Sequence, residues 1–325
     1  MTAADKFFDT EGAEVTGFAR PVLDLSRARM ENLHARLAES KMGRKLLDVF
    51  SEKLRGNELT VVARFDEQMQ TLGVCWPGKK VVHIFLDPRA DDDMLAAALV
   101  HELRHALQPL MGSTHYMPMS GFNRMFYSRV VEGDAFVHQV VYGLEHAKDT
   151  GDYSIANANA KYFTGKLWMD QRRTYADICQ NYLRAQTDNE KRDCLNQFFW
   201  IVQEQVLSSY DAENLEDLPK IIEQEVMRRG EGTGPQGRAL PPARENAMDI
   251  CVTHLMNLKN TPDVMGLEGW DHYLGDDDAD TAVRIVAAIK PDILGAVQEN
   301  YLAAERLNRE KPYIVGQNLP GLTSK

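Results

Sequence analysis

The chain has 325 residues, of which 44% are hydrophobic and 26% charged, so its composition is that of a folded globular protein with one large or two medium domains. Its 48 acidic and 37 basic residues give a formal net charge of −11. An excess of acid repels phosphate backbones and anionic lipids, so we expect neither nucleic acid nor a membrane surface as the main partner.

The compartment is predicted from the N-terminal segment and the cysteines. Residues 1–15 carry acidic side chains early and lack the apolar core of a secretory signal, and no stretch is apolar enough to span a bilayer. Four cysteines, at positions 75, 179, 194 and 251, are scattered without a CxxC pair. This pattern favours free, buried thiols in a reducing compartment, and we expect a cytoplasmic protein.

The first elements in chain order are helices followed by short strands. Residues 23–55 have helical spacing of apolar side chains. Three short segments rich in β-branched and aromatic residues follow at 58–65, 71–76 and 81–87. The turn sequence PGKK, at 77–80, joins the last two, so we predict a small, mainly antiparallel sheet.

A strong helix signal comes next. Three aspartates at 91–93 suit a helix N-terminus, residues 94–107 are good helix formers, and Pro109 ends the pattern. A second helix is predicted at 128–146.

Beyond residue 150 the pattern is helical to the end, interrupted by a Gly/Pro-rich loop at 230–243. We therefore expect an α+β catalytic domain in residues 1–150 and a mainly helical region of unknown role in 151–325. Because these helices have apolar faces that need burial, we expect them to pack around the cleft of the first domain.

The stretch LVHELRHALQ, residues 99–108, carries a possible metal site. His101 and His105 are four residues apart, so both imidazoles lie on one helix face, and Glu102 lies beside them. Two neutral histidines can hold Zn²⁺ while an adjacent glutamate takes a proton from water. An amphipathic helix can also carry this pattern by chance.

A third ligand is the feature that favours a metal. Glu132 follows His105 by 27 positions on the second predicted helix, among the apolar residues Val130, Val131 and Phe136. An unpaired buried carboxylate is costly, and a zinc ion is a natural partner for it. Gly133 would allow a neighbouring helix to approach closely. The alternative is an exposed glutamate on a surface helix.

These motifs carry a family resemblance. The sequence DDMLAAALVHELRHALQ followed by EGDAF resembles bacterial metallopeptidase domains of unknown function, and also the compact peptidases of the ImmA/IrrE kind, whose HExxH motif is followed by an ExEA-like helix. The matching positions are His101, Glu102, His105, Glu132 and Ala135, with Asp134 where that pattern usually has Glu.

The resemblance covers residues 25–147 and implies a minimal zincin core of the type with a glutamate ligand. In zincins an edge strand beside the site pairs with extended peptide, and the strand at 81–88, which precedes the motif helix, is the candidate here. The expected activity is that of a zinc metalloendopeptidase acting on a protein or peptide. One Zn²⁺ would be held by His101, His105 and Glu132, with Glu102 as general base.

Other polar residues are weaker candidates for the site. Candidate donors to the oxyanion or substrate are His115, Tyr116 and Tyr127, although a structural role explains each of them better. We expect Arg104 to point away from the metal into a surface salt bridge, and Asp134 to form a structural ion pair.

A zinc hydrolase of another substrate class stays open, because the motif defines the nucleophile and not the bond that is attacked. Two other classes of protein also stay open. One is a non-catalytic zinc-binding regulatory protein, against which the intact Glu102 argues, because a structural site needs no base. The other is a partner-binding helical protein whose HExxH motif is accidental, and bound metal would exclude it.

Overall fold

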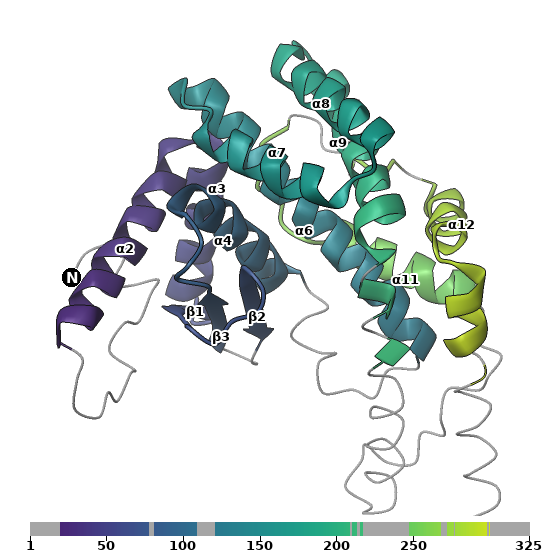
Figure 1. Cartoon of the computed structure of the whole chain (residues 1–325), viewed down its shortest axis with the longest axis horizontal. Helices are drawn as coiled ribbons and strands as arrows, with labels where there is room; N and C mark the ends of the chain where they lie inside the picture. Colours follow the sequence, from purple (N-terminus) through teal and green to yellow (C-terminus); the bar gives the residue numbers. More distant parts are fainter. Residues whose placement is uncertain are drawn as a thin grey trace, which may run out of the picture.

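The computed structural model of the protein combines many helices with one small sheet of three strands (Figure 1). It describes residues 20–77, 81–108, 121–208, 210–212, 215–216, 247–267, 272–275, 277–297 and 299. In Figure 1 the sheet, α2 (Arg20–Glu39) and α3 (Lys41–Arg55) lie on one side of α4 (Asp92–Leu107). On the other side, the helices that gather around α6 (Gly121–Thr150) are α8 (Met169–Arg184), α9 (Asp188–Ile201), α11 (Ala247–Lys259) and α12 (Asp278–Ala288). This is the predicted α+β fold.

The first helical segment is two helices. Helix α2 spans Arg20–Glu39 and α3 spans Lys41–Arg55, with the break at Ser40. The Ser40 hydroxyl accepts a hydrogen bond from the Gly43 backbone N–H at 2.9 Å, which caps α3. The apolar spacing of the sequence continues across this break, and the buried side chains Leu37 and Leu46 lie on either side of it.

The sheet has three strands, β1 (Thr60–Phe65), β2 (Gly73–Pro77) and β3 (Val81–Leu86), in the order β1-β3-β2. Strand β3 pairs antiparallel with β2 and parallel with β1. The prediction of a mainly antiparallel sheet is therefore wrong for the β1–β3 pair.

The parallel pair has a physical reason in the burial of β3. Val82, Ile84 and Leu86 are each at most 2% exposed, so β3 takes the centre of the sheet. Residues 66–72 then carry the chain from β1 past the position of β3 to β2. The antiparallel pair β2–β3 agrees with the predicted hairpin, whose turn residues 78–80 lie outside the described residues.

Helix α4 (Asp92–Leu107) carries the histidine motif and lies close to its predicted bounds. The Asp91 carboxylate caps it by accepting from the Met94 N–H at 2.8 Å. Almost every residue of α4 is buried, because one face packs on β2 and β3 and others on α2, α6 and α7. The motif helix is therefore at the centre of the molecule.

Helix α6 (Gly121–Thr150) packs along α4 and contains the second predicted helix. A Cβ on its Gly133 would lie 2.6 Å from the Phe199 ring and 2.5 Å from Gln203 Nε2. The predicted close approach at this glycine is thus confirmed. The remaining elements are α7 (Ser154–Lys166), α8 (Met169–Arg184), α9 (Asp188–Ile201), the π-helical turn η1 (Val202–Val206), α11 (Ala247–Lys259) and α12 (Asp278–Ala288).

Two further predictions are tested by the described residues. None of their helices is long and apolar enough to cross a bilayer. All four cysteines are free thiols, and three of them are buried. The predicted Gly/Pro-rich loop at 230–243 lies outside the described residues.

Candidate metal centre

Helices α4 and α6 bring together the three side chains that the sequence suggests as metal ligands. His101 Nε2 lies 3.1 Å from His105 Nε2 and 3.2 Å from Glu132 Oε2, and His105 Nε2 lies 3.4 Å from Glu132 Oε1. Both histidines are buried, while the Glu132 side chain is 19% exposed. The alternative interpretation, that Glu132 is an exposed residue on a surface helix, is therefore wrong.

The spacing of these three side chains fits a metal ion. Ligands about 2.0–2.1 Å from a tetrahedral zinc ion lie about 3.3–3.4 Å from one another, and the measured distances are within a few tenths of an ångström of that edge. Within the described part of the chain, no other group of three potential ligands converges in this way. Two imidazoles and one carboxylate also form a donor set that leaves a fourth position open to water.

Charge within this group favours a cation at its centre. Burial alone would lower the pKa of His105, but the Glu132 carboxylate and the Gln108 side chain raise it to about 9. Burial would raise the pKa of Glu132, yet the two imidazoles hold it well below its usual range. A bound metal would replace the proton that these groups otherwise share, so metal affinity should fall at low pH.

A buried glutamine orients His105. Gln108 Nε2 donates to the Val131 carbonyl and to Asp134 Oδ2, both at 3.0 Å, so its Oε1 is left to accept from His105 Nδ1 at 2.9 Å. With the proton on Nδ1, the neutral ring directs the Nε2 lone pair at His101 and Glu132. That is the tautomer a metal ligand needs.

Asp134 connects this glutamine to the C-terminal half of the chain. Its Oδ2 accepts from Arg104 Nε at 2.6 Å, and its Oδ1 accepts from the Tyr273 hydroxyl at 2.9 Å. Arg104 also donates to the Pro262 carbonyl at 2.8 Å. The predicted ion pair of Asp134 is confirmed, but a surface position for Arg104 is wrong, because the segment around Pro262 covers it and leaves it 2% exposed.

Glu102 lies on the side of α4 that faces strand β2. A Cβ at Gly73 would be 2.8 Å from Glu102 Oε1, so only glycine leaves room for the carboxylate there. The pKa of this carboxylate is raised, chiefly because burial outweighs the opposing effect of His101 and His105. The edge strand beside the site is therefore β2, and the prediction that assigned this place to residues 81–88 is wrong.

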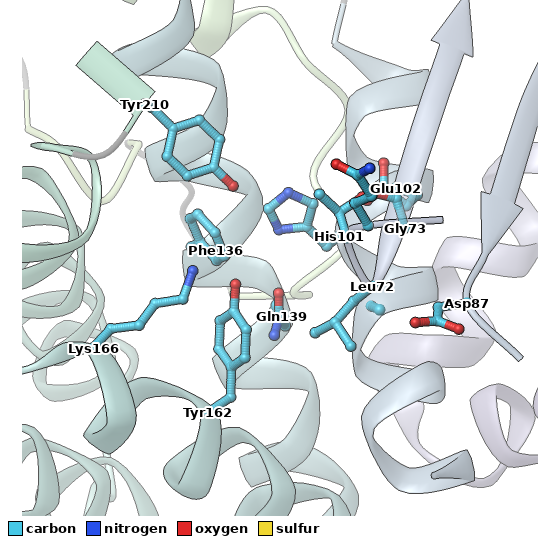
Figure 2. Close-up of a pocket in the computed structure, with 13 residues that line it drawn as sticks. Leu72, Gly73, Asp87, His101, Glu102, Phe136, Gln139, Tyr162, Lys166 and Tyr210 are labelled. Atoms are coloured by element: carbon cyan, nitrogen blue, oxygen red, sulfur yellow. The ribbon is translucent and has the colours of Figure 1, made fainter. Parts of the chain in front are cut away.

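A cavity of about 340 Å³ opens beside His101 and Glu102 (Figure 2). Its lining residues are Gln70, Thr71, Leu72, Gly73, Asp87, Ala98, His101, Glu102, Phe136, Gln139, Tyr162, Lys166 and Tyr210. Sequence reasoning missed Tyr162, Lys166 and Tyr210, since no motif distinguishes them from other residues of amphipathic helices.

Of the three donors suggested from the sequence, Tyr127 lies among the described residues, and it does not line the cavity. Tyr127 is buried and packs against His254 of α11, with ring centroids 5.5 Å apart. His115 and Tyr116 lie outside the described residues. In Figure 2 the Tyr210 hydroxyl points toward His101, so Tyr210 is a better candidate than Tyr127 for a donor to the oxyanion or substrate.

An α+β fold with this donor set beside a cavity belongs to the class of candidate metallopeptidases. Residues 13–216 match the model of a family described as "Putative metallopeptidase family (DUF6782)", and the chain belongs to that family. The predicted resemblance to metallopeptidase domains of unknown function is confirmed. The match includes His101, Glu102, His105 and Glu132 and ends before α11 and Tyr273. No curated protein and no solved structure matches the chain significantly.

Proposed function

We propose that the protein is a zinc-dependent metalloendopeptidase in which His101, His105 and Glu132 hold one Zn²⁺. The observation that carries this proposal is the convergence of the three side chains, whose nitrogen and oxygen atoms lie 3.1–3.4 Å apart beside an open cavity. Bound there, zinc would lower the pKa of water and polarise the scissile carbonyl.

Glu102 is proposed as the general base. It adjoins His101 on α4 and lines the same cavity, so it can take a proton from the attacking water and pass it to the leaving amine. Its pKa is raised by burial, which brings a carboxylate closer to the pKa that proton transfer near neutrality requires. The Tyr210 hydroxyl, which points toward His101 in Figure 2, is proposed to stabilise the oxyanion.

Two features support a peptide as the substrate. Strand β2 is an edge of the described sheet, and Leu72 and Gly73 line the cavity, so an extended peptide could add to β2 through main-chain hydrogen bonds. Tyr162 and Tyr210, both beyond residue 150, line the cavity as well. We propose that the helical region 151–325 narrows access to the site.

The test begins with metal content, measured by mass spectrometry on protein purified without a histidine tag. We expect near-stoichiometric zinc in the parent, less in Glu132→Ala and none in His101→Ala/His105→Ala. A peptide-cleavage screen follows, with Glu102→Gln as the inactive control that keeps its zinc.

Each outcome identifies a class of protein. Cleavage that requires Glu102 and zinc supports the peptidase. A zinc-loaded protein that cleaves no peptide is the non-catalytic zinc-binding regulator. A parent that stays free of metal after zinc is added back is a partner-binding helical protein.

A further inference from the structure

The cavity contains one basic side chain. Lys166, the last residue of α7, is the single lysine or arginine among its lining residues. Its Nζ lies 4.5 Å from the centroid of the Tyr162 ring, and in Figure 2 it is turned toward the interior beside Phe136. The cation–π contact holds the ammonium in this place, so the charge faces whatever enters the cavity.

No described carboxylate pairs with this ammonium. The two acidic residues of the cavity wall lie against other groups, since Asp87 accepts from Arg89 at 2.8 Å and the Glu102 carboxylate packs against Gly73 of β2. Lys191 provides a comparison, because it also lies over a tyrosine ring but pairs with Glu145 at 2.9 Å. Among the described residues, Lys166 therefore contacts the Tyr162 ring but pairs with no carboxylate.

The wall between the metal ligands and Lys166 is aromatic. The Phe136 ring centroid lies 4.5 Å from that of His101, 6.4 Å from that of Tyr162 and 6.1 Å from that of Tyr210. A surface of this kind accepts an apolar or aromatic side chain, and a single cation beside it fixes the orientation of an anionic group.

We propose that Lys166 makes this cavity selective for peptides that carry a carboxylate next to an apolar or aromatic side chain. The carboxylate binds the Lys166 ammonium while the apolar side chain packs on Phe136 and Tyr162. This inference rests on the proposed peptidase function and adds the substrate class. The carboxylate can be the C-terminal group of a peptide or the side chain of an acidic residue.

The test measures binding separately from cleavage. Three matched pools of hexapeptides rich in Phe and Leu, each labelled at the N-terminus with an uncharged fluorophore and free of charged side chains apart from the one named below, are titrated into zinc-loaded full-length Glu102→Gln protein. The first pool has a free C-terminal carboxylate, the second a C-terminal amide, and the third an amide plus one internal Glu. The substitutions Lys166→Met and Lys166→Glu are added to this background. Lys161→Met is the matched control, because Lys161 is an exposed lysine of the same helix outside the cavity wall.

We expect one of the two carboxylate pools to bind about tenfold more tightly than the amide pool. A tenfold ratio of dissociation constants corresponds to the free energy of one favourable charged contact. Lys166→Met should abolish this preference, Lys166→Glu should reverse it, and Lys161→Met should leave it unchanged. Whichever carboxylate pool binds more tightly identifies the source of the anion. High salt should weaken the preference, since the ammonium is exposed to solvent.

Equal binding of all three pools, or a preference that survives Lys166→Met, overturns the inference. Cleavage by the parent protein is followed in parallel by mass spectrometry. If all pools are cleaved equally, the peptidase proposal is supported and the proposed selection of carboxylates by Lys166 is refuted. If none is cleaved, the peptidase proposal fails, and the binding comparison still decides whether Lys166 selects carboxylates.

Discussion

Gly73 on β2 is the position at which the sheet comes closest to the proposed base. In Gly73→Ala, the new Cβ would lie 2.8 Å from Glu102 Oε1 and 2.9 Å from its Cγ. Ordinary contact begins at 3.4 Å, so the carboxylate must retreat by about 0.6 Å. Because a misplacement of about 1 Å can cost about 100-fold, we expect kcat/KM to fall by about tenfold.

The same substitution should leave the metal in place. None of the three proposed ligands is among the nearest neighbours of the new Cβ, so zinc content should equal that of the parent. Gly165→Ala is the matched control, because a Cβ there meets nothing within 4 Å, and its kcat/KM should be unchanged.

The assay is steady-state cleavage of a peptide found in the screen, with zinc content and melting temperature measured on the same samples. Full activity in Gly73→Ala would refute the argument, since β2 would then have yielded in place of Glu102. Loss of zinc in parallel with activity would also refute it, because the effect would not be confined to the base.

Three further predictions concern stability. Tyr273→Phe removes a hydrogen-bond donor to the buried Asp134 carboxylate and should lower the free energy of unfolding by about 1.5–3 kcal/mol. Urea titration measures this change, and an unchanged midpoint would contradict the prediction. Gly133→Ala places a methyl group 2.6 Å from the Phe199 ring and should cost about 1–3 kcal/mol by overpacking, whereas an unaltered melting temperature would show that α9 can move aside. Burial lowers the pKa of His138 from 6.5 to about 4, so between these values the unfolded chain binds more protons than the folded one. The free energy of unfolding of zinc-free protein should therefore fall by up to about 3 kcal/mol as the pH is lowered through this window, and His138→Asn should reduce this dependence.

The features that can be predicted from the sequence depend on interactions within a few residues. Helix α4 runs from Asp92 to Leu107 where 94–107 was predicted, because capping by Asp91 and helix propensity act over about one turn. The four-residue spacing of His101 and His105 likewise places both rings on one face. Glu132 was recognised as their partner because a carboxylate among apolar residues implies a buried counter-charge.

Contacts between distant segments were decided only by the tertiary structure. Apolar spacing marks the strands, but the burial of β3 decides that it separates β1 from β2 and that β2 lies beside Glu102. Asp134 and Tyr273 are 139 positions apart, and nothing near either residue in the sequence indicates the other. Lys166 comes to the cavity in the same way, because its helix packs on α4 and α6.

The physical reason is the range over which each free energy acts. Hydrogen bonds of helix ends and the period of 3.6 residues depend on immediate neighbours, so they can be recognised in a short stretch of sequence. The partner against which an apolar face is buried depends on the competition among all such faces in the chain, since burial is non-directional and scales with area. The spacing of His101 and His105 on α4 is of the first kind, whereas the cavity, the position of β2 beside Glu102 and that of Lys166 are of the second.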